Sequence, residues 1–332
     1  MELILQNHSS YPRIDEQPGQ PRLRRAHAAG ERGAIDSEEL VAIERAQIDA
    51  VIHEQEEAGV DVVTDGQVGW HDPVSHVMGR LDGVRLDGPL RYLDTNAYFR
   101  QPVVTGRLRR RAPIVVDDFA LARIAAERRV KPVLPGPYTL ARLSVLESGP
   151  YDGVPALAHA LSEVLAAEVS ELAQAGAEFI QIEEPAILSH PADIRLFRQL
   201  LEPLWAARNR AQLMVATYFG DAAPLYAQLN SVPADVLVLD FTYSATLLDV
   251  IRATGASAAL GLGVVDGRNT RMESAALVAR QVEDALRRYA LDTVHLLPSC
   301  GLGHLPRDSA RAKLALLAEI KGMVHGVQGG DG

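Results

Sequence analysis

The sequence of 332 residues contains a single cysteine, Cys300. One thiol cannot form an internal disulfide, and such low cysteine content is typical of proteins that work in a reducing compartment. No window reaches the roughly 18 consecutive apolar residues of a membrane-spanning helix. The first residues also lack the basic segment and long apolar run of a secretory signal. These absences predict a cytoplasmic protein that does not enter the membrane.

Basic residues are fewer than acidic ones: the chain has 33 Lys and Arg residues and 43 Asp and Glu residues, for a formal net charge of −10. This balance gives no general field that would attract a phosphate backbone, so nucleic-acid binding would need a local basic face. The arginine-rich stretch 107–111 precedes Asp117 and Asp118 and is better explained as a solvated loop. We therefore expect no nucleic-acid partner.

Several catalytic signatures are missing from the chain. It contains no Ser-His-Asp ordering, no Walker loop, no His-Glu-x-x-His and no Cys-x-x-Cys pair. The glycine-rich stretch 261–269 does not fit the dinucleotide-binding spacing. The sequence therefore gives no support for a hydrolase or a nucleotide-driven enzyme of those types.

What the chain does contain is a regular alternation of short apolar runs with long helical periods. The eight runs lie at 3–6, 61–66, 131–134, 178–183, 212–217, 235–240, 257–262 and 293–297. Continuous apolar strands separated by helices predict a parallel sheet that is buried on both faces. Because eight strands favour closure, we predict an α/β protein, a single (β/α)8 TIM barrel over residues 1–325.

Two segments fall outside this pattern. Residues 67–119 are irregular and rich in Arg, Asp, Pro and Gly. We interpret them as an inserted hairpin or lid between the second and third strands. Residues 326–332 form a glycine-rich end that we expect to be flexible.

In such barrels the chemistry takes place at the carboxyl ends of the strands. Glu183 and Glu184 end the fourth strand, and because side chains alternate, only one of them can point to the barrel axis. We choose Glu183, since a desolvated carboxylate normally has a functional partner. In the alternative interpretation, Glu184 caps the following helix and Glu183 pairs with a barrel lysine or arginine.

Two turns offer further candidates. Cys300 and His304 follow the eighth strand and are ligands that zinc accepts, although a buried, inert thiol is the better explanation of this segment taken alone. The rigid turn 135–137 could present the hydroxyl of Tyr138 to a ligand. The need to form a turn explains its two prolines and its glycine at least as well.

Taken in order, the segments at strand ends resemble the cobalamin-independent methionine synthase family, in its short single-barrel (core) type. The segments are Ser10-Tyr11-Pro12-Arg13, Thr64-Asp65-Gly66, Pro135-Gly136-Pro137-Tyr138-Thr139, Gln181-Ile182-Glu183-Glu184-Pro185, Thr217-Tyr218-Phe219-Gly220, Gly263-Val264-Val265-Asp266-Gly267-Arg268-Asn269 and Ser299-Cys300-Gly301-Leu302. The resemblance covers essentially the whole chain. It implies an enzyme that transfers a methyl group to the thiol of homocysteine to form methionine, with zinc holding the thiolate. The donor it implies is a folate or a corrinoid, the latter free or on a carrier protein.

The resemblance also implies roles for individual residues. Ser10, Gln67 and Glu183 fall on contacts to the amino acid, and we expect Tyr138 and Thr217 to contact the substrate as well. Cys300 falls on a cysteine ligand of zinc and Asp240 replaces a glutamate ligand, to which His304 is added as a third candidate. Arg268 stands where the family has a catalytic histidine, and we expect it to act in catalysis together with Asp266.

One departure concerns the metal. The His-x-Cys ligand pair of the family is matched by Thr217-Tyr218-Phe219, which cannot bind zinc in that way. Either the metal is held by a rearranged set, or the barrel binds none. The candidates for that set are Cys300, Asp240, His304, Glu183 and one of His8 and His71. The reaction has alternatives too, namely alkyl transfer to a different thiol, or a non-catalytic binding barrel that acts with a partner protein.

Overall fold

The computed structural model describes residues 2–13, 23–93, 95, 97–147, 149–288 and 293–328. The strands are β1 (Glu2–Leu5), β2 (Val62–Val63), β3 (Leu81–Arg91), β4 (Tyr98–Arg110), β5 (Arg129–Val130), β6 (Val133–Pro135), β7 (Val145–Leu146), β8 (Phe179–Glu183), β9 (Gln212–Thr217), β10 (Val236–Asp240), β11 (Ala259–Val265) and β12 (Thr293–Pro298). The α-helices are α1 (Leu23–Glu31), α2 (Ser37–Glu57), α3 (Pro73–Met78), α4 (Val116–Ala125), α5 (Pro137–Leu143), α6 (Gly153–Gln174), α7 (Ile194–Ala207), α8 (Tyr226–Leu229), α9 (Leu247–Thr254), α10 (Ala275–Arg288) and α11 (Arg307–Gln328).

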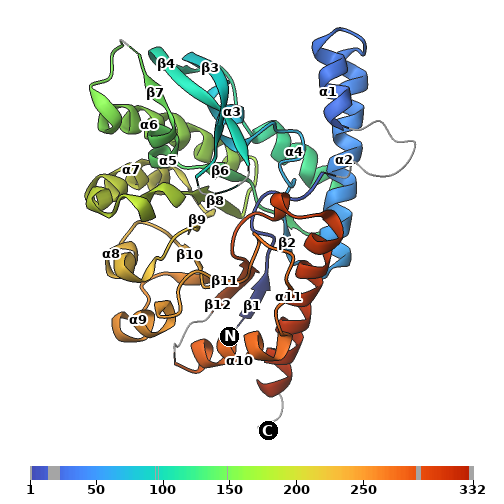
Figure 1. The fold of residues 1–332 in the computed structure, drawn as a ribbon, viewed down its shortest axis with the longest axis vertical. Coiled ribbons are helices and arrows are strands. Elements are labelled where there is room, and N and C mark those ends of the chain that lie inside the picture. Colours follow the sequence, from blue (N-terminus) through green and yellow to red (C-terminus); the bar gives the residue numbers. More distant parts are fainter. Residues whose placement is uncertain are drawn as a thin grey trace.

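The central strands are parallel, and helices surround them, as Figure 1 shows. Seven strands follow one another in the order β1-β12-β11-β10-β9-β8-β6. The predicted parallel α/β architecture is therefore confirmed. Each predicted apolar run overlaps one of these strands or β2, because strands buried on both faces need uninterrupted apolar sequence.

The path from β6 back to β1 runs through β5 and β2. β5 pairs in parallel with β2, and only Lys131 and Pro132 separate β5 from β6. Proline has no N–H to donate, so the ladder is interrupted there. On the other side of β2, Asn7 N donates to Val62 O at 3.1 Å. The hydrogen bonding thus returns to the strand where it began.

Alternation along the strands sorts the side chains into two layers. Ile4, Phe179, Met214 and Val238 belong to a small cluster of inward-facing residues, which spans several of the parallel strands. The residues next to them in sequence belong to the large cluster between the strands and the helices. In that outer layer α6 packs on α7 and α10 packs on α11. Gln181 and Glu183 share the inward parity of Phe179, which directs both side chains toward the interior.

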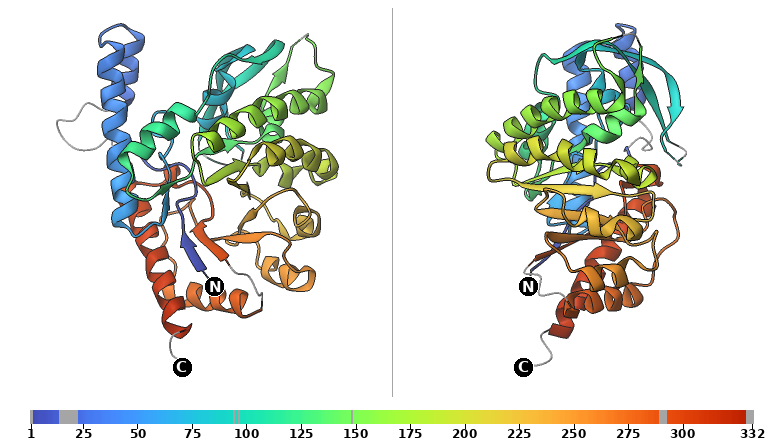
Figure 2. Two further views of the ribbon diagram at one scale, coloured as in Figure 1. Left: turned by 180° about the vertical axis from the view of Figure 1, so that it is seen from behind. Right: turned by 90° about the vertical axis from the view of Figure 1, so that its left-hand side faces the viewer.

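Between β2 and β5 the chain forms α3, an antiparallel pair of strands and α4. The antiparallel pair, β3 and β4, stands to one side of the parallel strands in both views of Figure 2. On the opposite flank, α2 lies beside α11, and α1 projects beyond the rest of the molecule (Figures 1 and 2). Of the predicted flexible end, residues 326–328 continue α11, and 329–332 lie outside the described residues.

Candidate active site

A cavity of about 700 Å³ opens at the carboxyl ends of the parallel strands. Segments that follow β1, β2, β9 and β12 line it, together with Glu183 at the end of β8 and residues at or next to the ends of β3 and β4. Four of the residues predicted from the sequence lie on its wall, namely Ser10, Gln67, Glu183 and His304. The cavity therefore lies at the end of the strands where the sequence predicts a site.

Glu183 is a buried carboxylate on the wall of this cavity, with 4% of its surface exposed. Its Oε1 lies 3.2 Å from Nδ1 of His8, and its Oε2 accepts a hydrogen bond from the hydroxyl of Tyr218 at 2.9 Å. Burial by itself would raise the pKa of Glu183, but the hydrogen bonds from His8, Ser9 and Tyr218 outweigh it and hold the pKa below its usual value. Glu183 is therefore a charged, oriented acceptor that faces open space.

His8 supports this charge without carrying one itself. Burial lowers the pKa of His8, although the neighbouring Glu183 opposes the shift. A carboxylate only accepts, so we assign the proton to Nδ1, which leaves Nε2 as an acceptor. Nε2 is buried, and in the described part of the chain it has no hydrogen-bond partner.

Three aromatic rings stand beside Glu183. The rings of Tyr218 and Phe219 meet at 84° with centroids 4.7 Å apart, and Tyr92 meets Phe219 at 73° and 6.5 Å. The hydroxyl of Tyr92 lies 3.3 Å from that of Tyr218. Because Tyr92 follows β3, this contact joins the antiparallel pair β3–β4 to the carboxylate. Sequence reasoning assigned no substrate-binding role to His8, Tyr92 or Tyr218.

Gln67 is held in a strained conformation at the cavity wall. Its φ angle is +54°, in the left-handed region that non-glycine residues seldom adopt, and the preceding Gly66 has φ +67°. Its side-chain Nε2 is buried, and no partner for it is found among the described residues. Strain of this kind collects at functional sites. Nearby, the hydroxyl of Ser10 accepts a hydrogen bond from Gly303 N at 3.3 Å.

Cys300, Asp240 and Thr217 are buried, and none of them is part of the described cavity wall. A Cβ on Gly267 would lie 2.8 Å from the Cys300 sulfur, so the loop after β11 covers the thiol. Burial raises the pKa of Cys300 far above its usual value, and the charge of Asp240 adds to the shift. Burial also raises the pKa of Asp240. The Cys300 thiol therefore stays protonated near neutral pH.

Asp240 and Thr217 each keep a buried oxygen without a partner among the described residues. Oδ1 of Asp240 accepts from Thr242 N at 2.9 Å and from its hydroxyl at 2.6 Å, while Oδ2 accepts from none. Thr217 shares the parity of Val215, which belongs to the outer layer, and this explains why it does not line the cavity.

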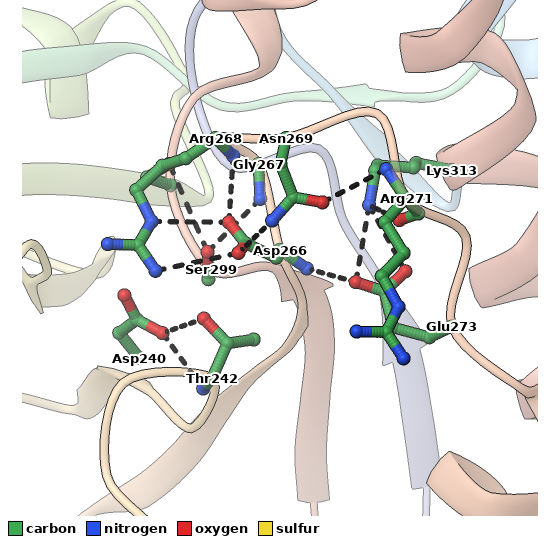
Figure 3. Close-up of polar contacts among 11 residues, drawn as sticks. Asp240, Thr242, Asp266, Gly267, Arg268, Asn269, Arg271, Glu273, Ser299 and Lys313 are labelled. Atoms are coloured by element: carbon green, nitrogen blue, oxygen red, sulfur yellow. Dashed lines mark hydrogen bonds and ion pairs between the residues drawn. The ribbon is translucent and has the colours of Figure 1, made fainter. Parts of the chain in front are cut away.

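Asp266 and Arg268 lie in a braced loop after β11, drawn in Figure 3. Asp266 accepts from Arg268 N at 2.8 Å, and the Arg268 guanidinium lies 4.7 Å from the centre of the Tyr243 ring. Asp266 N donates to Glu273, which also pairs with Lys313 at 3.1 Å (Figure 3). Neither Asp266 nor Arg268 belongs to the described cavity wall.

Tyr138 turns away from the cavity. Its hydroxyl donates to Asp193 at 2.7 Å, and its ring contacts that of Phe197 on α7. Glu184 accepts from the backbone N–H groups of Tyr138 at 2.9 Å and Thr139 at 2.7 Å. Glu184 therefore caps α5, while Glu183 faces the cavity. Burial raises the pKa of Glu184 to about 7.

The residues present do not fit the zinc ion that the sequence resemblance implies. Within the described ranges, no three His, Cys, Asp or Glu side chains converge as a ligand set. Zinc sites use nitrogen, sulfur and carboxylate ligands, whereas β9 ends at Thr217 and is followed by Tyr218 and Phe219. His304 lines the cavity, whereas Cys300 and Asp240 are buried and do not belong to its wall.

Fold and site together define a parallel α/β protein with a buried carboxylate in a cavity at the ends of its strands. Residues 13–322 match the family described as cobalamin-independent synthase, catalytic domain, and the chain belongs to this family. No helix in the described part of the chain is long and apolar enough to cross a membrane.

Two archaeal relatives show the extent of the likeness. The methionine synthase of Saccharolobus solfataricus is 30% identical over 93% of this chain and 91% of its own length. That of Thermococcus kodakarensis is 31% identical over 96% and 90%. Among solved structures, a B12-independent methionine synthase from Shewanella sp. W3-18-1, in complex with selenomethionine, superposes with a TM-score of 0.79 at 21% identity over 98% of both chains. This last match shows the shared fold.

Proposed function

We propose that this chain is a methionine synthase, which transfers a methyl group to the thiol of homocysteine and forms methionine. The observation that carries the proposal is the charged Glu183 carboxylate, buried on the wall of a cavity in a member of this family. A carboxylate removed from water needs a cation, and the α-ammonium group of an amino acid supplies one.

The carboxylate end of homocysteine then meets donors across the cavity. The Gln67 amide has an N–H group that is buried and unpartnered among the described residues, and the Ser10 hydroxyl lies on the same wall. Both are neutral donors, which suits an anionic group held close to Glu183. The strain at Gln67 is consistent with a residue kept for recognition rather than for stability.

Methyl transfer needs the homocysteine thiol as a thiolate. The sulfur lone pair forms a bond to the methyl carbon, while the bond from that carbon to the donor breaks and its electron pair leaves with the donor. We assign His304 as the acceptor of the thiol proton, because it lines the cavity and partial desolvation there lowers its pKa, so that the imidazole is neutral and can accept a proton. No step is assigned to a metal ion.

The remaining predicted residues take supporting places in this proposal. Cys300, Asp240 and Thr217 are buried outside the cavity wall, and Asp266 and Arg268 brace the loop that covers Cys300. Tyr138 belongs to the cap of α5. We also propose that the fold is a single (β/α)8 barrel in which residues 67–119 are an inserted lid that reaches the site through Tyr92. The lone cysteine fits a cytoplasmic setting.

The cavity is far larger than homocysteine, and pockets of this volume hold drug-sized ligands. We therefore place the methyl donor in the same cavity. The assay below supplies three methyl donors one at a time: a folate, a free corrinoid, and a corrinoid on its carrier protein.

The test is methionine formation by the purified chain from homocysteine and each donor, followed by mass spectrometry. Complementation of a methionine auxotroph by this gene alone supports the proposal in cells. Other thiols in place of homocysteine test alkyl transfer to a different acceptor. No methionine from any donor, together with no binding of homocysteine, would reject the proposal.

The absence of a ligand set for zinc among the described residues favours a second candidate, a barrel that binds homocysteine for a partner protein. The same experiment separates the two. Homocysteine binding without turnover by the chain alone supports the binding role.

A further inference from the structure

Lys131, between β5 and β6, is fully buried. Lysines are rarely buried completely, because the ammonium group loses its hydration. Burial lowers the pKa of Lys131 to about 7, although the negative charge of Glu183 pulls in the opposite direction. The reaction proposed above does not use this residue, and it lies outside the described cavity wall.

The ammonium group of Lys131 donates a hydrogen bond to Oε1 of Gln181 at 2.6 Å. Gln181 precedes Glu183 by two residues on β8, so both side chains point to the same side of the strand. In its charged form lysine has donors only, and this form can face only the oxygen of the amide. Lys131 therefore decides which way round the Gln181 amide lies.

This orientation turns the nitrogen of the amide toward Glu183. Nε2 of Gln181 donates to the backbone oxygen of His8 at 3.0 Å and lies 3.4 Å from Oε1 of Glu183. Reversed, the amide would place its oxygen against the His8 carbonyl and the Glu183 carboxylate, which are both acceptors. The contact with Lys131 excludes that arrangement.

Glu183 is consequently held at both oxygens. Oε1 lies against His8 and Gln181, and Oε2 accepts from the Tyr218 hydroxyl. A carboxylate fixed in this way presents its remaining lone pairs to the cavity in one direction. Such fixing by neighbouring groups is what keeps a binding group in its productive geometry.

We propose that Lys131 is a positioning residue for Glu183, and that it acts through the amide of Gln181. The inference rests on the proposed function, in which Glu183 binds the ammonium group of homocysteine. Lys131 itself does not touch the ligand. It sets the orientation of the carboxylate, and its effect therefore concerns the amino group of the ligand alone.

A second buried lysine provides a matched control. Lys313 on α11 is also fully buried, and it donates to Arg271 O at 2.7 Å and to Glu273 (Figure 3). None of these three residues belongs to the described cavity wall. Lys313→Met and Lys131→Met therefore remove the same group at the same burial, but only the second one lies next to Glu183 and Gln181.

The experiment compares two ligands that differ only in the amino group, homocysteine and 4-mercaptobutanoate, by calorimetry. We expect the wild-type chain to prefer homocysteine by about 100-fold, and Glu183→Gln to abolish the preference. Lys131→Met and Gln181→Leu should each reduce the preference about tenfold, and the double variant should reduce it no further, because both changes break one connection. The Lys313→Met variant should prefer homocysteine over 4-mercaptobutanoate as strongly as the wild-type chain does, although this variant should be less stable to unfolding.

Two results overturn the proposal. The first is a preference in Lys131→Met equal to that of the wild type, and the second is an additive loss in the double variant. If Lys131→Met does not fold, Gln181→Leu decides the question by the same comparison. If the wild-type chain and Glu183→Gln bind the two ligands alike, the ammonium site itself is wrong, which is a failure of the proposed function and is recognisable as such.

Discussion

Gly136, at the end of β6, allows a sharp test of how the fold fixes the Glu183–Glu184 pair. A Cβ at this position would lie 2.2 Å from both Cδ and Oε1 of Glu184 and 2.4 Å from its Cγ. These distances are far below van der Waals contact. Glu184 is fully buried and caps α5 by accepting from Tyr138 N and Thr139 N. Gly136→Ala must therefore displace this carboxyl group from its two donors.

The cost follows from those contacts. A hydrogen bond to a charged group contributes about 1.5–3 kcal/mol, and overpacking a core adds about 1–3 kcal/mol. Because a small backbone shift recovers part of this, we expect Gly136→Ala to lower the free energy of unfolding by about 3–5 kcal/mol. Urea unfolding followed by circular dichroism measures this loss, and calorimetry should show a Tm lower by roughly 5 °C or more.

Two controls make the result specific. Gly322 lies inside α11, where a Cβ would point into open space, so Gly322→Ala should stabilise the chain by about 0.5–1 kcal/mol. In a Glu184→Ala background the clash is gone, and Gly136→Ala should then cost less than about 1 kcal/mol. The reasoning is refuted if Gly136→Ala is as stable as the wild type, or if its cost is the same in both backgrounds.

Four further outcomes are expected. Tyr218→Phe removes the hydroxyl that donates to Glu183 and should weaken homocysteine binding about tenfold by calorimetry, with little change in Tm; unaltered affinity would contradict the role of that contact. Glu184, whose pKa is raised to about 7 in the folded chain against 4.5 in the unfolded one, contributes stability that is complete below about pH 4.5 and is lost as the pH rises through 7. Stability should accordingly fall by about 1.4 kcal/mol between pH 6 and 8, and Glu184→Gln should flatten that dependence in urea titrations. Cys300 should resist an aromatic disulfide reagent in the native chain and react fully in urea, so rapid labelling of folded protein would argue against its burial. Because the described residues offer no zinc ligand set, a chelator or added zinc should leave the Tm unchanged, and a zinc-dependent rise would show a site that this donor set does not explain.

The strands are predictable from the sequence because each is an apolar run that ends at residues unable to continue it. The run 212–217 coincides with β9, since it is buried along its whole length after its first residue. The run 61–66 yields only the two residues of β2. Its partner strand is divided at Pro132, which cannot donate to the ladder, and a sequence pattern read one strand at a time does not contain this information.

The site is predictable only in part, because the sequence specifies where a strand ends but not where the next side chains point. Glu183 follows from the two-residue alternation of β8. The same rule applied to β9 places Tyr218 on the cavity wall and Thr217 behind it, opposite to our choice of Thr217 as a substrate contact. Tyr92 comes from an antiparallel strand outside the ring, and no periodicity along the parallel strands indicates it.

The interior of the strand ring changes character along its axis. Toward the amino ends of the strands, apolar side chains such as Ile4, Phe179 and Val236 fill it, and apolar packing tolerates exchange of one residue for another of similar volume. Toward the carboxyl ends, Lys131, Gln181 and other polar side chains take their place. A buried polar group is stable only when its partners are present and correctly oriented, so each of these residues constrains the next. The geometry of the carboxylate in the cavity therefore depends on side chains that never meet the ligand.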